Sequence, residues 1–328
     1  MKKIFVSGAT GFIGIQLVKR LVQSGHKVHA LYRSDSKAHL IRMEGVTLFK
    51  GDILDKECLY GAMQGCSQVY HVAAFAAVWS KDPTLFHRFN VDGTLNLIDA
   101  AREAEIERVV VTSTAGILGP SVKKPVNEES PVPDSFFTLY EDSKYIMEQE
   151  LKNIKQSKPE IVIVNPTRVY GPGFLSKSNG MSLMIKKYIA GNWRFIPGDG
   201  KRMGNYVYVE DVVSGHLLAM EKGKPGERYI LGGEDISYNQ LFDFVRRASG
   251  VSKRLFHIPV RFLFLAAGLF SVLSKITGQP PLIVPSWVRK LTRNWVVSSK
   301  KAIEELGYSP MNASEGIDKT VNWIIANN

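Results

Sequence analysis

The fold is decided by residues 2–14, which read KKIFVSGATGFIG. A short apolar run ends in a glycine-rich turn, and residues 15–25 (IQLVKRLVQSG) follow with helical spacing and a closing glycine. Gly8, Gly11 and Gly14 therefore lie between a strand and a helix. There they permit a tight turn and a close approach of the backbone to a pyrophosphate, to which the helix N-terminus offers free N–H groups. A glycine turn without a ligand is the alternative, and it does not require this strand–turn–helix context.

The same alternation of strand and helix continues through the first half of the chain. Pro83 opens a helical stretch, PTLFHRFNVDGTLNLIDAAREA, that ends at residue 104. Strands separated by helices form βαβ units with right-handed crossovers and a sheet buried on both faces. The sequence therefore predicts an α/β fold with a doubly wound, Rossmann-type parallel sheet. Apolar runs rich in β-branched residues place its strands near residues 3–7, 27–32, 46–50, 68–73, 108–113 and 161–165.

A second, smaller domain is expected after about residue 171, where the composition changes. Residues 171–182 (GPGFLSKSNGMS) read as a Gly/Ser-rich linker. The helix EDVVSGHLLAMEKG and the strand ERYILGG are expected to return to the first domain. A discontinuous second domain would lie over the carboxyl ends of the strands, where ligands bind in open α/β sheets. The predicted divisions are residues 1–171 plus about 209–231 for dinucleotide binding, and about 172–208 plus 232–328 for substrate binding.

Composition and charge narrow the class of protein. The 328 residues are 45% hydrophobic and 22% charged, which is ordinary for a globular protein. The net charge of +11 suits an anionic ligand, a nucleic acid or a membrane surface. The basic residues come in scattered pairs such as Lys123/Lys124, however, and form no stripe interleaved with aromatic residues. We therefore expect no nucleic-acid partner.

Cysteine and histidine usage bears on redox chemistry and metal binding. Cys58 and Cys66 are the only cysteines, and no signal peptide is recognised. Free thiols in a reducing compartment are therefore predicted, which favours a cytoplasmic protein. The seven histidines show no metal-ligand spacing, so no metal site is predicted. His71 is expected to be a packed residue at a strand end.

A candidate proton donor lies in residues 138–150, TLYEDSKYIMEQE, which read as the opening of an exposed, charged helix. Tyr140 and Lys144 are four residues apart and therefore share one face of that helix. Tyr four residues before Lys is common by chance, so the pair in isolation indicates only two exposed surface residues without a catalytic role. Its interpretation depends on what the rest of the chain places beside it.

Several motifs together resemble the extended short-chain dehydrogenase/reductase family, which is part of the NAD-dependent epimerase/dehydratase superfamily. The resemblance begins with SGATGFIG at the N-terminus and YEDSK near residue 140. Within the family, the sequence pattern is most similar to the dihydroflavonol-4-reductase-like branch. The motifs occur in the family's order over most of the first 230 residues, and the others are GDIL (51–54), HVAA (71–74), NVDGT (90–94), VVVTSTA (109–115), NPTRVYGPG (165–173) and YVYVEDV (206–212).

The resemblance implies a catalytic set. Tyr140 would be the general acid/base, with Lys144 beside it lowering its pKa and holding the nicotinamide ribose, since a free Tyr has a pKa of about 10. Thr114 would bind the substrate oxygen, with Ser113 as a substitute one residue earlier. Asn90 matches the family position that holds a structural water and a main-chain carbonyl. Asn90 as a helix-bending polar residue is the alternative.

The end of the second predicted strand indicates the cofactor. An acid there selects NAD through the ribose 2′-OH, but HALYRSDSK (residues 29–37) places Arg33 at this point. The planar fork of Arg33, supported by Ser34 and Lys37, suits the 2′-phosphate of NADP(H). Recruitment of Asp35 would permit NAD(H) instead. The sequence favours NADP(H) and leaves NAD(H) open.

The other cofactor contacts follow from the resemblance. Asp52 would face the adenine amine, and Val169 would line the nicotinamide. The remaining predicted contacts are Gly8, Thr10, Gly11, Phe12, Ile13, Gly14, Ile53, Ala73, Ala74, Tyr140, Lys144 and Pro166.

Residues 258–278, IPVRFLFLAAGLFSVLSKITG, contain thirteen uncharged residues from Phe262 to Ser274. That is short of the roughly 20 apolar residues of a membrane span. A buried helix roofing an apolar substrate pocket is the favoured interpretation. An interfacial helix is the alternative, with peripheral membrane contact through residues 261–295. Relatives that pair as dimers suggest a homodimer.

The sequence thus predicts an NADP(H)-dependent oxidoreductase that transfers hydride between nicotinamide and a carbonyl or alcohol carbon of an apolar small molecule. The alternatives are a nucleotide-sugar epimerase or dehydratase that keeps its NAD bound, a 3β-hydroxysteroid-dehydrogenase-like enzyme, and a redox-sensing binding protein. Sugar enzymes of the family carry an Arg-Asp-aromatic triplet whose Arg binds the diphosphate. Here that place holds Gly204, Asn205 and Tyr206, which favours the reductase, with Arg202 and Arg168 as substitutes for the missing Arg.

Overall fold

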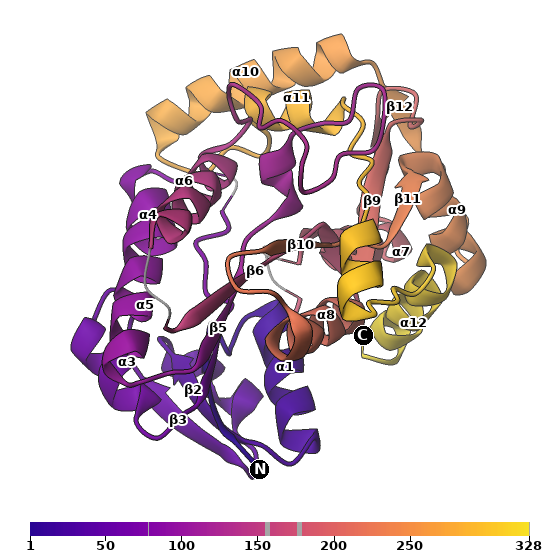
Figure 1. Cartoon of the computed structure of the whole chain (residues 1–328). Coiled ribbons are helices and arrows are strands. Elements are labelled where there is room, and N and C mark those ends of the chain that lie inside the picture. Colours follow the sequence, from indigo (N-terminus) through magenta and orange to yellow (C-terminus); the bar gives the residue numbers. More distant parts are fainter. Residues whose placement is uncertain (78, 155–157, 176–178, 328) are drawn as a thin grey trace.

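The computed structural model describes the whole chain except residues 78, 155–157, 176–178 and 328. Its centre is a seven-stranded, all-parallel sheet with the order β10-β6-β5-β4-β1-β2-β3 (Figure 1). The predicted doubly wound sheet is therefore confirmed, including all six strands of the first half. The strands are β1 (Lys3–Ser7), β2 (Lys27–Tyr32), β3 (Val46–Lys50), β4 (Gln68–His71), β5 (Arg108–Thr112), β6 (Glu160–Pro166) and β10 (Arg228–Leu231).

Helices cover both faces of this sheet, as Figure 1 shows. Alternate strand residues point to opposite faces, so Ile4 and Val6 pack with the first helical layer and Phe5 with the second. The first layer is α1 (Phe12–Gln23) and α8 (Val209–Lys222). The second layer is α3 (Lys56–Met63), α5 (Gly93–Glu103) and α6 (Leu139–Asn153).

The stretch opened by Pro83 is a composite helix. It begins with α4 (Thr84–His87), passes through a π-helical turn at Arg88–Asp92 and continues as α5. A π-turn inserts an extra residue into the helical repeat and frequently marks a functional site. Short segments elsewhere are α2 (Asp35–Ala38), 3-10 turns at His39–Ile41 and Ala115–Leu118, and a π-turn at Ala302–Leu306.

The second half builds smaller sheets that stand beyond the carboxyl ends of the main strands. Aromatic residues such as Tyr206 and Tyr208 form the core between a three-stranded sheet and three helices. The domain divisions stay a prediction, although β10 and α8 do lie with the main sheet. The elements are β7 (Arg168–Tyr170), β9 (Met203–Tyr208) and β11 (Glu234–Ser237), the pair β8 (Phe195–Pro197) and β12 (Phe256–Ile258), and helices α7 (Gly180–Ile189), α9 (Tyr238–Ser249) and α12 (Ala313–Ala326).

The predicted linker at residues 171–182 is shorter than expected. Helix α7 already begins at Gly180, where the Asn179 side chain accepts a hydrogen bond from Ser182 N. Residues 176–178 of that prediction lie outside the described residues.

Helix α10 (Val260–Thr277) corrects the prediction of a buried roof. Only Ala267 and Ser274 of this helix are buried, and it lies along the outer margin of the molecule beside α11 (Pro285–Leu291) (Figure 1). Leu265 is 69% exposed and Ile276 is 76% exposed. Composition alone cannot reveal burial, because burial depends on whether another element packs on the apolar face. The interpretation as a buried helix was wrong.

Candidate active site and cofactor cradle

The glycine turn after β1 has the shape of an anion cradle. Gly8 has φ +67° and lies against the backbone of Ala73, where a Cβ would overlap it, and a Cβ on Gly14 would overlap the Gly8 carbonyl. Gly11 N donates to Gly8 O at 2.9 Å and Gly11 forms the N-cap of α1, with no side-chain cap and no acidic residue in the first helical turn. Thr10, Phe12 and Ile13 complete this turn. The first N–H groups of α1 therefore remain open to a pyrophosphate, so the residues fit a dinucleotide.

The adenosine end of the predicted site brings Arg33 and Asp52 together. Their side chains form an ion pair at 3.5 Å, and the Arg33 guanidinium lies 5.2 Å from the ring centroid of Phe89. Asp35, the residue that would serve NAD, is instead paired with Lys50 at 2.5 Å. Arg33 is thus in place beside the Asp52 carboxylate, and Asp35 is engaged elsewhere.

The other predicted cofactor contacts lie in separate surroundings. Ser34 Oγ bonds to Ser36 Oγ at 2.8 Å, and the Lys37 ammonium lies 5.4 Å from the Phe174 ring centroid. Ala73 N donates to Ser7 Oγ at 3.4 Å, which keeps the loop containing Ala73 and Ala74 next to the glycine turn. Ile53 packs against Gly93 at the start of α5, whereas Pro166 ends β6 and Val169 lies in β7.

Helix α6 is not the exposed helix that its charges suggested. A capping box starts it, in which Thr138 and Glu141 bond each other's backbone N–H. Its inner face buries Lys144 and Glu148 completely, and Glu141 pairs with Lys290. The prediction of an exposed helix was wrong because these charged groups find partners inside the protein.

Lys144 is directed at the end of β5. Its Nζ donates to Thr112 O at 2.8 Å, and burial lowers the pKa of the amine to about 8, against the raising effect of the Glu148 carboxylate. The pKa of Tyr140 is raised, by burial first and by the Glu141 carboxylate second. The expectation that Lys144 lowers the pKa of Tyr140 is therefore corrected for the protein alone, because Lys144 engages the β5 carbonyl.

Two hydroxyls follow β5, and they differ in their surroundings. Thr114 is half-buried, and its Oγ1 accepts from Gly116 N at 3.1 Å. Gly116 also lies against Glu141, so the first turn of α6 is beside Thr114. Ser113 Oγ is buried and has no hydrogen-bond partner among the described residues. The Thr114 hydroxyl retains a proton to donate, whereas Ser113 is shut away from the surface.

Asn90 lies within the π-turn and joins three segments. Its Oδ1 accepts from Phe75 N at 2.7 Å, and its Nδ2 donates to Ser143 Oγ at 2.9 Å and to Phe75 O at 3.4 Å. Asn90 thereby ties the loop after β4 to the helix that carries Tyr140. Its place in a π-turn also fits the helix-bending alternative.

A buried imidazole connects this region to the glycine turn. His71 Nδ1 bonds to Ser7 Oγ at 2.7 Å, and Nε2 bonds to Thr94 Oγ1 at 2.9 Å. Thr94 Oγ1 donates in turn to Asn90 O at 2.8 Å. Burial, with a smaller effect of Lys144, lowers the pKa of His71 to about 3. His71 is therefore neutral, and its burial confirms the packed strand-end residue that the sequence predicted.

Two buried residues of the site were missed in the sequence. Glu148 accepts from Asn165 Nδ2 at 2.7 Å and pairs with Arg228 at 3.4 Å, and Asn165 Nδ2 also bonds to Thr114 O at 3.2 Å. Glu148 lies one helical turn beyond Lys144, and this spacing could have indicated in the sequence that Glu148 shares the inner face of the helix with Lys144. The partnership with Asn165 depends on tertiary structure and has no such signal.

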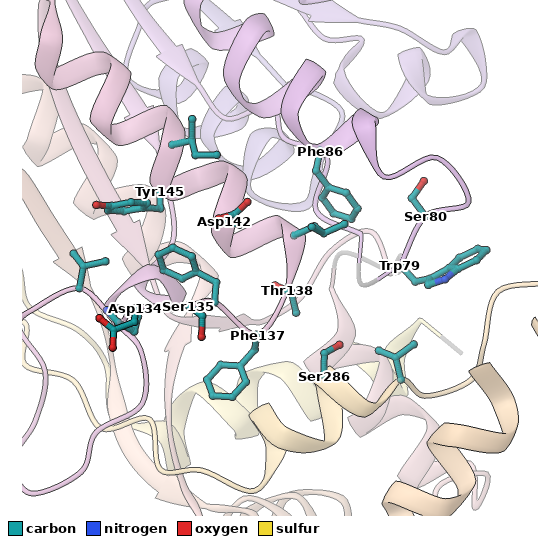
Figure 2. Close-up of a pocket in the computed structure, with 16 residues that line it drawn as sticks. Trp79, Ser80, Phe86, Asp134, Ser135, Phe137, Thr138, Asp142, Tyr145 and Ser286 are labelled. Atoms are coloured by element: carbon teal, nitrogen blue, oxygen red, sulfur yellow. The ribbon is translucent and has the colours of Figure 1, made fainter. Parts of the chain in front are cut away.

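A cavity of about 1020 Å³ opens beside α6 (Figure 2). The segment 132–139, immediately before Tyr140, forms one wall, and Val284 and Ser286 of the α11 region form another. Aromatic side chains line it, among them Trp79, Phe86, Phe137 and Tyr145. Tyr140 itself is not part of the lining, and neither is any residue of 262–274, so the cavity is not beneath the segment expected to roof it.

Metal chemistry was not predicted, and the described part of the chain holds no group of three or more His, Cys, Asp or Glu placed to bind a metal ion. Cys58 and Cys66 are both free.

Comparison with known proteins agrees with this geometry. The model of the NAD-dependent epimerase/dehydratase family matches residues 4–232. A Synechocystis sp. protein described as "Putative dihydroflavonol 4-reductase" is 32% identical over 326 residues, covering 97% of this chain and 93% of that protein. The 2-alkyl-3-oxoalkanoate reductase of Stenotrophomonas maltophilia is 29% identical over 330 residues, covering 96% of this chain and 97% of that protein.

Solved structures show the same relationship. The structure of gox2253 has a TM-score of 0.85 and 32% identity, covering 100% of this chain and 99% of that chain. The UDP-glucose 4-epimerase of Thermotoga maritima, solved with UDP-glucose, has a TM-score of 0.82 and 25% identity, with 99% of each chain covered.

The fold and the cradle define an NAD(P)-dependent enzyme of the extended short-chain dehydrogenase/reductase type. The chain belongs to the NAD-dependent epimerase/dehydratase family, with relatives in its dihydroflavonol-4-reductase-like branch. The resemblance seen in the sequence is thereby confirmed.

Proposed function

We propose that this enzyme is an NADP(H)-dependent oxidoreductase acting on a carbonyl or alcohol carbon of a largely apolar small molecule. The supporting observation is the placement of α6 at the end of β5: Lys144 bonds to Thr112 O, and the first turn of α6 lies beside Thr114. The α1 cradle opens at the same edge of the sheet, where ligands of doubly wound folds bind. The aromatic cavity beside α6 fits an apolar substrate.

Each residue of the set has a distinct task in carbonyl reduction. The nicotinamide, when bound, would supply the hydride that the carbonyl carbon receives. Thr114 holds the substrate oxygen by its hydroxyl, and Tyr140 gives that oxygen a proton as the C=O double bond becomes a C–O single bond. Lys144 then serves to restore the proton of Tyr140. Its ammonium gives up a proton readily, because its pKa is lowered to about 8. Asn90 holds α6 in register with the loop after β4 through Ser143 and Phe75.

The direct test is a screen of carbonyl compounds for loss of NADPH absorbance, with mass detection of the products. The reductase predicts an alcohol two hydrogens heavier than its substrate. A nucleotide-sugar epimerase or dehydratase instead predicts a changed sugar nucleotide with no net consumption of cofactor, and that result would replace this proposal. A redox-sensing binding protein predicts cofactor binding without any turnover.

Cofactor choice gives a specific prediction for Arg33. We expect Arg33→Ala to weaken NADPH binding about 10- to 100-fold, because a charge-assisted bond to the 2′-phosphate is lost. NADH binding should change by less than about threefold, since the 2′-OH gives that guanidinium no charge to bind. Fluorescence titration of both cofactors measures this, with the exposed Arg42→Ala as the matched control. Equal losses for NADPH and NADH would disprove the preference.

We also propose that α10 lies on an anionic membrane surface. Its exposed apolar side chains recur along one helical face, at Phe262, Leu265, Leu269, Val272 and Ile276. Judged by length and composition alone, it is the one helix of the described chain that could cross a membrane. Helix α11 packs beside it within the fold. A helix resting in the plane of the interface, with its exposed face in the lipid, therefore suits this geometry.

Charge favours a negatively charged surface as the occupant of that face. Residues 244–303 contain eleven Lys and Arg and no Asp or Glu. Basic residues lie near both ends of α10, at Arg261 and Lys275, and Arg289 and Arg293 follow in and after α11. Basic residues beside an inserted apolar face contribute about 1 kcal/mol each near anionic lipid.

Sedimentation with vesicles tests this contact. We expect the protein to sediment with vesicles that mix phosphatidylcholine and phosphatidylserine, less so in high salt, and weakly with phosphatidylcholine alone. The double variant Leu265→Ser/Leu269→Ser should lose most binding while keeping its thermal stability, because both side chains are exposed. Val122→Ser, at a position 88% exposed on another segment, is the matched control. Binding that survives the double variant would contradict the proposal.

A further inference from the structure

Arg168 is a cation held between two tyrosines. It begins β7, and its Cζ lies 5.4 Å from the ring centroid of Tyr206 and 5.9 Å from that of Tyr238. Its Nη1 donates to both phenol oxygens, at 3.1 Å and 3.4 Å. Burial raises the pKa of Tyr206, so this phenol stays protonated and does not neutralise the guanidinium.

The guanidinium occupies the place beside Gly204 where this strand lacks a side chain. A Cβ on Gly204 would overlap Nη1 of Arg168. The register of β7 and β9 explains the approach: Arg168 lies opposite Tyr206, and Gly204 shares a face of β9 with Tyr206. The chain therefore presents an arginine at the position that the sequence leaves empty, and supplies it from the neighbouring strand.

The charge of Arg168 has no counterion in the described chain. No carboxylate of the described residues lies within ion-pair distance, and Nε and Nη2 hydrogen-bond to no described residue. Neither atom is among the fully buried side-chain atoms that lack a partner. One edge of the guanidinium is thus held by the phenols, and the Nε and Nη2 donors of the opposite edge keep no hydrogen-bond partner among the described residues.

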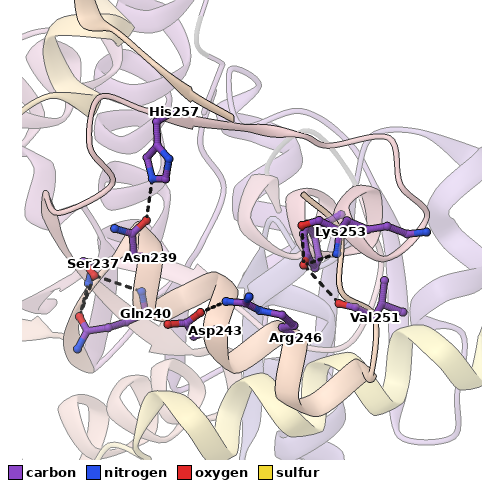
Figure 3. A network of polar contacts seen from close by, with 9 residues as sticks. Ser237, Asn239, Gln240, Asp243, Arg246, Val251, Lys253 and His257 are labelled. Carbon is purple, nitrogen blue, oxygen red and sulfur yellow. Dashed lines mark hydrogen bonds and ion pairs between the residues drawn. The ribbon is translucent and has the colours of Figure 1, made fainter. Parts of the chain in front are cut away.

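The tyrosines hold this donor rigidly. Tyr238 is the first residue of α9, whose start is fixed by a capping box between Ser237 and Gln240 (Figure 3). The next residue, Asn239, bonds to His257 of β12 at 3.2 Å. Tyr206 is only 1% exposed, within the core of the small sheet. Such a preformed fork loses little conformational entropy when it binds an anion.

Arg168 also lies at the edge of the main sheet that carries the candidate catalytic residues. Strands β5 and β6 pair with Thr112 opposite Val164, so Thr114 and Arg168 both follow adjacent strand ends. Asn165 bonds to the carbonyl of Thr114 at 3.2 Å. Gly204 also forms an isolated β-bridge with Trp295. The Trp295 ring packs edge-on against Phe137, which lines the aromatic cavity.

We propose that Arg168 binds the carboxylate of the substrate, which makes the substrate an apolar oxo acid or hydroxy acid. This rests on the proposed reductase function and narrows its substrate class. One open guanidinium edge matches one carboxylate with two parallel N–H···O bonds. A diphosphate carries more charge, and Arg168 is the one cation found over the rings of Tyr206 and Tyr238 among the described residues. The largely apolar small molecule of the proposed function is then an apolar acid.

Binding without turnover is the primary test, since it does not depend on the reductase chemistry. The NADP-loaded protein is titrated calorimetrically with octanoate and with octanamide, which match in length and differ in charge. We expect octanoate to bind more tightly, and Arg168→Gln to weaken octanoate about 10- to 100-fold with little change for octanamide. Arg202→Gln, an exposed arginine two residues from Gly204, is the matched control. Equal binding of the two probes to the wild-type protein overturns the proposal.

A second variant keeps the test independent of any loss of folding in Arg168→Gln. Gly204→Ala retains the charge but places a methyl group in the space of Nη1, so it should displace the fork and weaken octanoate. Added to Arg168→Gln or Arg168→Lys, the same change should have no further effect on octanoate, because the two act through one contact. Additive losses would mean that Arg168 merely supports the sheet.

Turnover and a nucleotide probe separate the remaining outcomes. With NADP⁺, the KM for 3-hydroxyoctanoate should rise in Arg168→Gln by the same factor as octanoate binding weakens, while the KM for its methyl ester stays constant. If octanoate binds but 3-hydroxyoctanoate is not oxidised, the carboxylate site at Arg168 stands and the proposed oxidoreductase function is refuted. Micromolar binding of UDP that Arg168→Gln abolishes would refute the carboxylate and favour a sugar-nucleotide enzyme.

Discussion

Tyr140→Phe should lower kcat on a reducible carbonyl substrate by about 10²- to 10⁴-fold, the range that general acid catalysis contributes. Only the transferable proton is removed, since Phe keeps the ring that packs at the start of α6. NADPH affinity should stay within about twofold of the wild type, because the cradle after β1 and the Arg33–Asp52 pair are untouched. Single-turnover kinetics and fluorescence titration measure the two quantities separately.

The exposed Tyr60 provides the control for that substitution. Tyr60→Phe removes the same hydroxyl from α3 and should leave kcat unchanged. If Tyr140→Phe retains near wild-type kcat while the enzyme is saturated with substrate, the assignment of Tyr140 as proton donor fails.

Acidification should destabilise the fold strongly through two buried imidazoles. Burial lowers the pKa of His71 to about 3 and that of His216 to about 4, whereas an unfolded histidine has a pKa of about 6.5. Below about pH 6.5 the unfolded chain therefore binds protons that the folded chain does not, and the free energy of unfolding falls as the pH drops. Between about pH 7.5 and about pH 5 each histidine should remove roughly 2 kcal/mol, or roughly 4 kcal/mol together.

Urea unfolding at the two pH values measures this loss. His71→Gln and His216→Gln should each halve the pH dependence, even if either lowers stability at neutral pH by disturbing the bonds to Ser7, Thr94 or Thr112. His39→Gln, at an exposed position, should leave the pH dependence as it is. A free energy of unfolding that is equal at both pH values would show that the buried imidazoles are not held neutral.

The large sheet could be predicted from the sequence because its determinants are local. The strand Arg108–Thr112, for example, is a β-branched run whose last four residues are buried, and parallel strands buried on both faces tolerate such continuous runs. The glycine turn was equally readable, since only a residue without a Cβ fits where Gly8 meets the backbone of Ala73. In the strands and in the glycine turn alike, the residues that the local pattern favours are also the residues that the tertiary packing requires.

Other features lay beyond the sequence because they arise from tertiary contacts. Helix α6 looked exposed by its charges, but Glu148 and Lys144 are buried with partners on β5 and β6. Helix α10 looked like a core helix by its composition, and no pattern within it reveals that no other described part of the chain covers its outer face. Arg168 and Gly204 are 36 positions apart in the chain and meet only through the register of two strands.

The segment 244–303 gives the molecule a lopsided distribution of charge. Its eleven basic residues equal the net charge of the chain, so the remaining residues hold 31 basic and 31 acidic groups in balance. Near a negative surface such a body experiences a torque that turns its basic side inward, within about one Debye length, or roughly 8 Å, in physiological salt. In the proposed membrane contact, the protein would thus approach the lipid surface already oriented, with α10 nearest the surface and the cofactor cradle farther from it.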